Sequence, residues 1–279
     1  MKKISRRSFL AAAGLSVAAL ALTACGGSSA STASSVASSA ASSEAASTSA
    51  AAGELTTVEA GKLTMATNAT FPPYEMTTDA GTIEGIDVDT AQAIAEKLGL
   101  ELQIDDMDFD AALLSVQQGK ADIAMAGITV TDERMAVMSF SDSYATGIQS
   151  IIVPNDSDIA SPDDLAGKTI GTQRGTTGYI YCSDDFGDEN VVAYDDGLTA
   201  VQALNNGQVD AVVIDNAPAQ EFVAANPGLK VLDTSYAEED YAIGMAKGSS
   251  LEAAVNAALE ELKADGTLQA IVDKYITAE

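Results

Sequence analysis

Hydroxyl and guanidinium groups follow an apolar run in residues 122–134, which read DIAMAGITVTDER. The apolar run predicts a buried strand, and the backbone around Gly127 is bare just beyond it. Thr131 predicts a helix N-cap, because its hydroxyl can accept a hydrogen bond from the next turn. Arg134 lies in that turn, and its planar guanidinium can hold a carboxylate through two hydrogen bonds. The stretch therefore predicts a carboxylate site built from Gly127, Thr129 and Arg134.

A surface ion pair is the alternative interpretation of this arginine. After residue 24 the chain contains two arginines, Arg134 and Arg174. Arg134 could pair with Asp132, Glu133 or Asp142 in solvent, and such a pair would have no binding role.

Composition and charge exclude several functional classes. The 279 residues carry a formal net charge of −27 and contain no histidine. Without histidine the chain cannot build a Ser-His-Asp or Cys-His catalytic centre, nor a histidine-ligated metal site. A protein this acidic does not bind nucleic acid by counterion release. We predict no cofactor, no metal site and no nucleic-acid partner.

The first 56 residues predict export and anchoring. Residues 1–24 combine a basic start with an apolar run, as a signal peptide does. Cys25 follows that run as in a bacterial lipobox, which predicts a palmitate-bearing lipoprotein on the cell membrane. Residues 25–56 are almost entirely small residues after the cysteine, and predict a disordered tether. The sequence SRRSFL at 5–10 resembles a twin-arginine export signal, although an ordinary basic start also fits.

From residue 57 onward, strand and helix patterns alternate at the spacing of an α/β fold with covered parallel sheets. Ligands of such sheets bind beyond the carboxyl ends of the strands. The predicted strands are 63–67, 100–104, 148–153, 169–172, 209–214 and 241–246. The predicted helices are 87–98, 111–117, 197–205, 251–264 and 268–275.

An internal repeat indicates two similar lobes. Residues 114–124 and 201–211 both read as a helix, a glycine turn and a strand. We predict one lobe from 57–146 plus 242–279, and a second from 147–241. Two chain crossings between them predict a double hinge, with a ligand cleft between the lobes.

The second lobe carries a possible anion site of its own. The sequence QRGTTG at 173–178 follows a predicted strand and opens a helix, whose free amides favour an anion. A plain turn explains the same residues equally well. Asp215 closes a later strand and caps the next helix.

With these motifs in place, residues 58–276 resemble the extracytoplasmic amino-acid-binding proteins of ABC importers, in the polar amino acid family. The motifs in family order are ATNATFPPYE at 66–75, GIDVD at 85–89, the AGIT-x-T-x-x-R run ending at Arg134, SFS at 139–141, GTT at 175–177, and Asp215. Glutamine-binding members have the closest pattern. The resemblance implies a two-lobed periplasmic-binding-protein fold in which one strand is swapped between parallel-type sheets.

The resemblance also implies how the two ends of a free amino acid are held. Arg134 would clamp the α-carboxylate, assisted by the backbone at Gly127 and Thr129. Thr177 would add an amide from the second lobe, and Asp215 would accept the α-ammonium. A zwitterion needs one fixed cation and one fixed anion, which agrees with these residues.

The remaining implied contacts surround the ligand side chain. Phe71 would lie over the ligand, and Asn68, Phe109, Gln173 and Ile214 would line the side-chain pocket. Many family members carry an aspartate where Asn68 stands, and an acid there suits a basic ligand. We therefore expect a neutral polar, glutamine-like amino acid.

The resemblance implies delivery of the ligand to an ABC permease and its ATPase by a monomer that touches the membrane only through its lipid. Two other functions remain as alternatives. Some relatives of this fold are cyclohexadienyl dehydratases, which need a general acid over a leaving group; Asp215 is the cleft acid that the sequence indicates. A receptor sensor domain would need a membrane-spanning helix after Ile276, which the sequence does not predict.

Overall fold

The computed structural model describes residues 55–276. The predicted signal peptide, the lipidation site at Cys25 and all but the last two residues of the predicted tether lie outside the described residues. Within residues 55–276, no helix combines the length and the apolar character needed to cross a bilayer.

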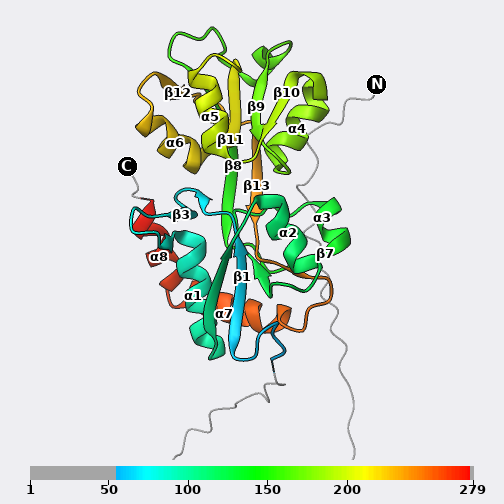
Figure 1. Cartoon of the computed structure of the whole chain (residues 1–279). Coiled ribbons are helices and arrows are strands. Elements are labelled where there is room, and N and C mark those ends of the chain that lie inside the picture. Colours follow the sequence, from blue (N-terminus) through cyan, green and yellow to red (C-terminus); the bar gives the residue numbers. More distant parts are fainter. Residues whose placement is uncertain (1–54, 277–279) are drawn as a thin grey trace, which may run out of the picture. The chain divides into compact units, whose positions relative to one another are not determined.

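The first lobe is built on a five-stranded sheet (Figure 1). Its strands, in spatial order, are β5 (Glu101–Asp106), β1 (Lys62–Thr67), β6 (Ile123–Ala124), β14 (Gly244–Ala246) and β7 (Met138–Phe140). β1 runs parallel to β5 and β6, whereas β14 runs antiparallel to β6 and β7. The helices of this lobe are α1 (Ile86–Leu98), α2 (Phe109–Gln117), α3 (Asp132–Val137), α7 (Glu252–Ala264) and α8 (Thr267–Tyr275).

A small antiparallel sheet lies at the top of this lobe and carries the two prolines. Its strands are β2 (Thr70–Phe71), β3 (Glu75–Thr77) and β4 (Ile83–Glu84). Phe71 stands directly opposite Glu75 in this sheet, so the two side chains share one face.

The second lobe contains a six-stranded sheet. Its strands are β10 (Val191–Tyr194), β9 (Ile170–Gln173), β11 (Ala211–Asp215), β8 (Ala145–Pro154) and β12 (Leu229–Val231), with β13 (Ala237–Tyr241) also paired to β8. β9 is parallel to β10 and β11, and β8 is antiparallel to its three partners. The helices are α4 (Thr177–Phe186), α5 (Gly197–Asn205) and α6 (Asn216–Ala225), with short 3-10 turns at Pro162–Leu165 and Asp188–Asn190.

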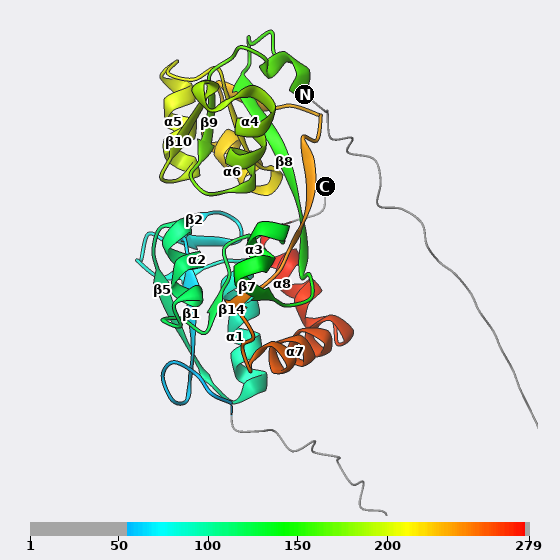
Figure 2. The same cartoon turned by 90° about the vertical axis from the view of Figure 1, so that its right-hand side faces the viewer.

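Two antiparallel strands, β8 and β13, join the lobes (Figure 2). The predicted strand 241–246 is wrong in one respect, because Tyr241 ends β13 and Gly244 begins β14. The chain leaves one sheet at this point and enters the other, so its backbone cannot pair continuously. β14 then lies between β6 and β7, and this swapped strand and the double crossing confirm the predicted fold class.

The helix α1 shows how sequence spacing becomes packing. Ala91, Ile94 and Ala95 lie on one face and are fully buried, as helical spacing predicts. Gly99 ends the helix in the left-handed conformation (φ +70°), which glycine adopts without a steric penalty.

The internal repeat reappears as two matching structural units. α2 leads through Gly119 to β6, and α5 leads through Gly207 to β11. Both glycines have φ +66°. The aspartates at equivalent positions make equivalent hydrogen bonds. Asp122 accepts from the Thr64 amide and Asp210 from the Thr169 amide, both at 2.8 Å. Each unit thus ties its strand to the neighbouring strand.

The entry to α1 generates a stability prediction. Gly85 has φ +142°, and a Cβ there would lie 2.1 Å from the carbonyl oxygen of Tyr74. We expect Gly85→Ala to lower the free energy of unfolding by about 3 kcal/mol, because the strained backbone must also move away from Tyr74. Gly81→Ala is the matched control, since Gly81 has φ +78° and nothing within 4 Å. It should lose about 1 kcal/mol in urea unfolding, and equal losses would contradict this account.

Candidate functional site

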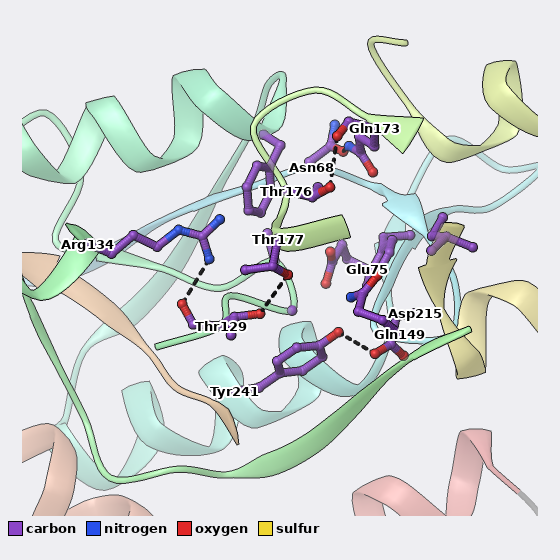
Figure 3. A pocket seen from close by; sticks show the side chains of 15 residues that line it. Asn68, Glu75, Thr129, Arg134, Gln149, Gln173, Thr176, Thr177, Asp215 and Tyr241 are labelled. Carbon is purple, nitrogen blue, oxygen red and sulfur yellow. Dashed lines mark hydrogen bonds between the residues drawn. The ribbon is translucent and has the colours of Figure 1, made fainter. Parts of the chain in front are cut away.

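One cavity between the lobes collects every predicted binding residue (Figure 3). The ten that line it are Asn68, Phe71, Phe109, Gly127, Thr129, Arg134, Gln173, Thr177, Ile214 and Asp215. The water-sized space left inside is about 20 Å³, enough for one water molecule. The side chains of the two lobes therefore leave little free space at the site.

Arg134 is buried, with 9% of its surface exposed. The Thr131 hydroxyl caps α3 by accepting from the Arg134 amide at 3.2 Å, as predicted. The guanidinium donates to the carbonyl oxygens of Thr129 (2.8 Å) and Gly175 (3.0 Å) and lies 5.4 Å from the centre of the Phe109 ring. It forms no salt bridge with any residue in 55–276, so the alternative of a surface ion pair is wrong.

The backbone at Gly127 differs from the bare strand end that the sequence predicts. Its amide donates to Asp87 Oδ2 at 3.0 Å and is not free. Gly127 has φ +55°, and a Cβ there would lie 2.8 Å from the Phe71 ring. This glycine therefore allows close packing of the aromatic ring.

Hydrogen bonds cross the cleft at its closed edges. Gln173 Nε2 donates to Asn68 Oδ1 at 2.9 Å, and the hydroxyls of Thr129 and Thr177 lie 3.4 Å apart. Thr177 is the first residue of α4, where a backbone amide has no partner within the helix. Residues predicted from separate lobes therefore do meet. Arg174 lies outside this cavity and is exposed beside Asp195, 3.5 Å away.

Asp215 lies at the end of β11 and caps α6, as the sequence predicts. Its carboxylate accepts from the Tyr241 hydroxyl (2.6 Å) and from the amides of Ile148 (2.8 Å) and Ala217 (3.2 Å). Burial raises the pKa of Asp215 to about 6, because a charged carboxylate is desolvated there, although these hydrogen bonds oppose the shift. Figure 3 shows Asp215 and Arg134 on opposite sides of the cavity.

Sequence analysis missed five lining residues: Glu75, Ala126, Gln149, Thr176 and Tyr241. Glu75 matters most, because it is fully buried and neither carboxyl oxygen meets a nitrogen or hydroxyl donor among the described residues. Burial raises its pKa well above the usual range, and the nearby Asp87 carboxylate adds to the shift. Asp215 is therefore not the only acid in the cleft. The pairing of Phe71 with Glu75 across the proline turn is the signal that could have revealed it.

Charge in and around the cavity is dominated by acids. Burial lowers the pKa of Arg134, and the negative charge of Glu239 opposes that shift. Burial also raises the pKa of Asp87 to about 6, against the hydrogen bond from Gly127. The arrangement has one buried cation and several buried carboxyl groups, so a positively charged group is favoured beside the acids.

Comparison with known proteins gives a consistent result. Residues 63–278 match the model of the bacterial extracellular solute-binding proteins, family 3. The chain is 32% identical to the L-cystine-binding protein TcyJ of Escherichia coli over 225 residues, covering 79% of this chain and 85% of that protein. It is 32% identical to the arginine-binding extracellular protein ArtP of Bacillus subtilis over 228 residues, covering 78% and 87%. These relatives are named as binding proteins and not as enzymes.

A solved structure has the same fold. It is an ancestral arginine-binding protein bound to glutamine, with a TM-score of 0.75 and 40% identity. The match covers 78% of this chain and 99% of that one.

The raised pKa of Asp215 predicts a pH dependence of stability. Because its pKa is about 6 when folded and about 3.8 when unfolded, the folded state binds more protons between these values. The stability contributed by this group is thus present below pH 3.8 and is lost as pH rises through 6. The shift corresponds to about 3 kcal/mol.

We expect the difference in unfolding free energy between wild type and Asp215→Asn to move by about 2.4 kcal/mol in favour of the variant between pH 4 and pH 7.5. Urea unfolding of the ligand-free proteins measures it. Asp87 titrates in the same range but is present in both proteins, so its contribution cancels. A difference that stays constant with pH would refute the assignment.

Proposed function

The chain belongs to family 3 of the bacterial extracellular solute-binding proteins, and from this premise we propose that it binds one free amino acid in its cleft and delivers it to an ABC permease. The observation that carries the proposal is an unpaired buried cation and an unpaired buried anion on one cavity. Neither Arg134 nor Asp215 has a salt-bridge partner among the described residues. The α-carboxylate and α-ammonium of an amino acid supply both missing charges.

The two ends of the ligand are assigned from these charges. Arg134 holds the α-carboxylate in this proposal, with Thr129 and the free amide at Thr177 nearby. Asp215 accepts the α-ammonium. The guanidinium now donates to two backbone carbonyls, and a carboxylate is a stronger acceptor for it than a neutral carbonyl.

The opposite part of the cavity suits a neutral polar side chain. Asn68 and Gln173 already pair amide to amide across the cleft, and a carboxamide can replace either partner. Phe71, Phe109 and Ile214 add apolar walls. We therefore propose a glutamine-like ligand, and the ancestral arginine-binding protein with glutamine bound shows that a related site accommodates this amino acid.

Glu75 supports a second candidate, a cationic amino acid such as arginine. Its carboxyl group lines the cavity and meets no nitrogen or hydroxyl donor among residues 55–276, although the Asp87 carboxyl hydrogen-bonds to it. A guanidinium side chain would supply both a donor and a neutralising charge. Glutamine would instead meet Glu75 in its protonated form, which can donate to a carboxamide oxygen.

We also propose how the rest of the chain serves delivery. Residues 1–24 direct export, Cys25 carries the lipid with its palmitate, and the tether to residue 56 lets the lobes reach the permease. The first lobe comprises 57–146 with 242–279, and the second 147–241. The protein acts as a monomer and passes its ligand to the permease, which a separate ATPase drives.

Isothermal titration with the twenty amino acids and cystine tests the ligand. We expect tight binding of L-glutamine, because the amide pair at Asn68 and Gln173 matches its side chain. Arg134→Met should weaken the binding of any amino acid by about 100-fold or more, since the carboxylate loses its charged partner. Tight binding of arginine without glutamine would overturn the neutral side-chain assignment. Full affinity in Arg134→Met would overturn the site.

A second substitution separates the two side-chain candidates. Glu75→Gln should weaken L-arginine by about tenfold or more, because it removes a charged acceptor for the guanidinium. The affinity for L-glutamine should change by less than about threefold. Glu84→Gln is the matched control, because Glu84 is exposed on the same small sheet. Equal losses for both amino acids in Glu75→Gln would mean that Glu75 only supports the fold.

A further inference from the structure

Glu239 is a buried acid that no part of the proposed binding scheme uses. It lies on β13, one of the two strands joining the lobes, and is 6% exposed. Its Oε2 lies 3.1 Å from the Thr129 hydroxyl and 2.9 Å from Gln149 Nε2. Thr129 belongs to the first lobe and Gln149 to the second, and both line the cavity. Glu239 therefore lies directly behind two cavity residues.

Chemistry fixes the direction of both hydrogen bonds. A carboxylate only accepts, so the Thr129 hydroxyl and the Gln149 amide nitrogen must donate to Glu239. The Gln149 carbonyl oxygen consequently points the other way. It is buried, has no hydrogen-bond donor among the described residues, and lies close to the first turn of α4 at Gly178. The Thr129 hydroxyl spends its one proton on Glu239 and therefore accepts from the Thr177 hydroxyl, 3.4 Å away.

The residue Gln149 is the strand neighbour of the proposed ammonium acceptor, Asp215. Gln149 and Asp215 stand directly opposite each other in the pairing of β8 with β11. Side chains opposite one another project from the same face of a sheet, and Figure 3 shows the two next to each other. Both residues line the cavity, and neither of these two acceptors can donate to the other. Such a pair is complementary to a group that carries several hydrogens and a positive charge.

We propose that the Gln149 carbonyl completes the ammonium site with Asp215, and that Glu239 is the positioning residue that holds Gln149 and Thr129 as acceptors. The inference rests on the proposed function and extends it. Its consequence is selection for the α-ammonium group of the ligand. An amino acid is favoured over an analogue that lacks this group. Because Glu239 hydrogen-bonds to one residue of each lobe, the same bonds help to hold the two lobes together around an ammonium.

Ligand pairs that differ only in the α-ammonium test the proposal. The probes are L-glutamine with 4-carbamoylbutanoate, and L-arginine with 5-guanidinopentanoate, measured by isothermal titration. In Glu239→Gln the new amide can donate hydrogen bonds as well as accept them. Thr129 and Gln149 then no longer have to be the donors in these contacts. We expect affinity for the amino acid to fall about tenfold or more, as for loss of a hydrogen bond to a charged group. Affinity for the analogue should change less than about twofold.

Two further variants provide a second test and a control. Gln149→Met removes the carbonyl at similar size and should reproduce the loss for the amino acid only. Glu238→Gln is the control, because Glu238 is exposed on the same strand, and it should bind all four probes like wild type. Thermal melting of each ligand-free variant detects loss of folding separately.

The outcomes separate the inference from the function beneath it. If Glu239→Gln or Gln149→Met weakens the amino acid and its analogue by the same factor, the residues are merely structural and the inference is overturned. If neither variant changes the affinity for the amino acid, it is overturned as well. If the wild-type protein binds none of the twenty amino acids and no cystine, the proposed function itself fails, and the inference fails with it.

Discussion

Buried charges that lack partners of opposite sign are the constraint on which this structure depends. Arg134 is held by backbone carbonyls, and Asp215 by a hydroxyl and two amides, with no salt bridge between them. Removing charges from water without pairing them is unfavourable. The closed cleft is therefore electrostatically incomplete on its own. In the proposed function a dipolar ligand completes it, which ties closure of the lobes to binding.

The scaffold holds these charged groups in fixed positions on rigid elements. Two repeat units place a helix, a glycine turn and a strand in each lobe, and Asp122 and Asp210 fasten those strands to their neighbours. Rigid strand ends and helix N-termini then hold the polar groups at one edge of each sheet. The joining strands β8 and β13 contribute Gln149 and Tyr241, so the hinge is itself part of the cavity.

Carboxyl groups outnumber cationic groups in and around this cavity, and this surplus of negative charge favours a positively charged ligand group. Glu75 and Asp215 line the cavity and Asp87 and Glu239 lie buried behind it, whereas Arg134 is its one guanidinium among the described residues. Burial raises the pKa of Glu75, Asp87 and Asp215, so protons or a cationic ligand must balance the site. The surplus favours an ammonium at the Asp215 end, and leaves Glu75 as the group on which the choice between a neutral and a cationic side chain depends.

Sequence alone determined the family, the two-lobed α/β class and ten of the fifteen residues that line the cavity, because each of the ten belongs to a local motif that follows a strand or opens a helix. Its prediction of a free amide at Gly127 was wrong, since Asp87, forty residues away, accepts from that amide. Tertiary structure alone brought Gln149 and Glu239 to the site. Their positions depend on strand register and on crossings between distant segments, and such pairing leaves no short-range pattern in the chain.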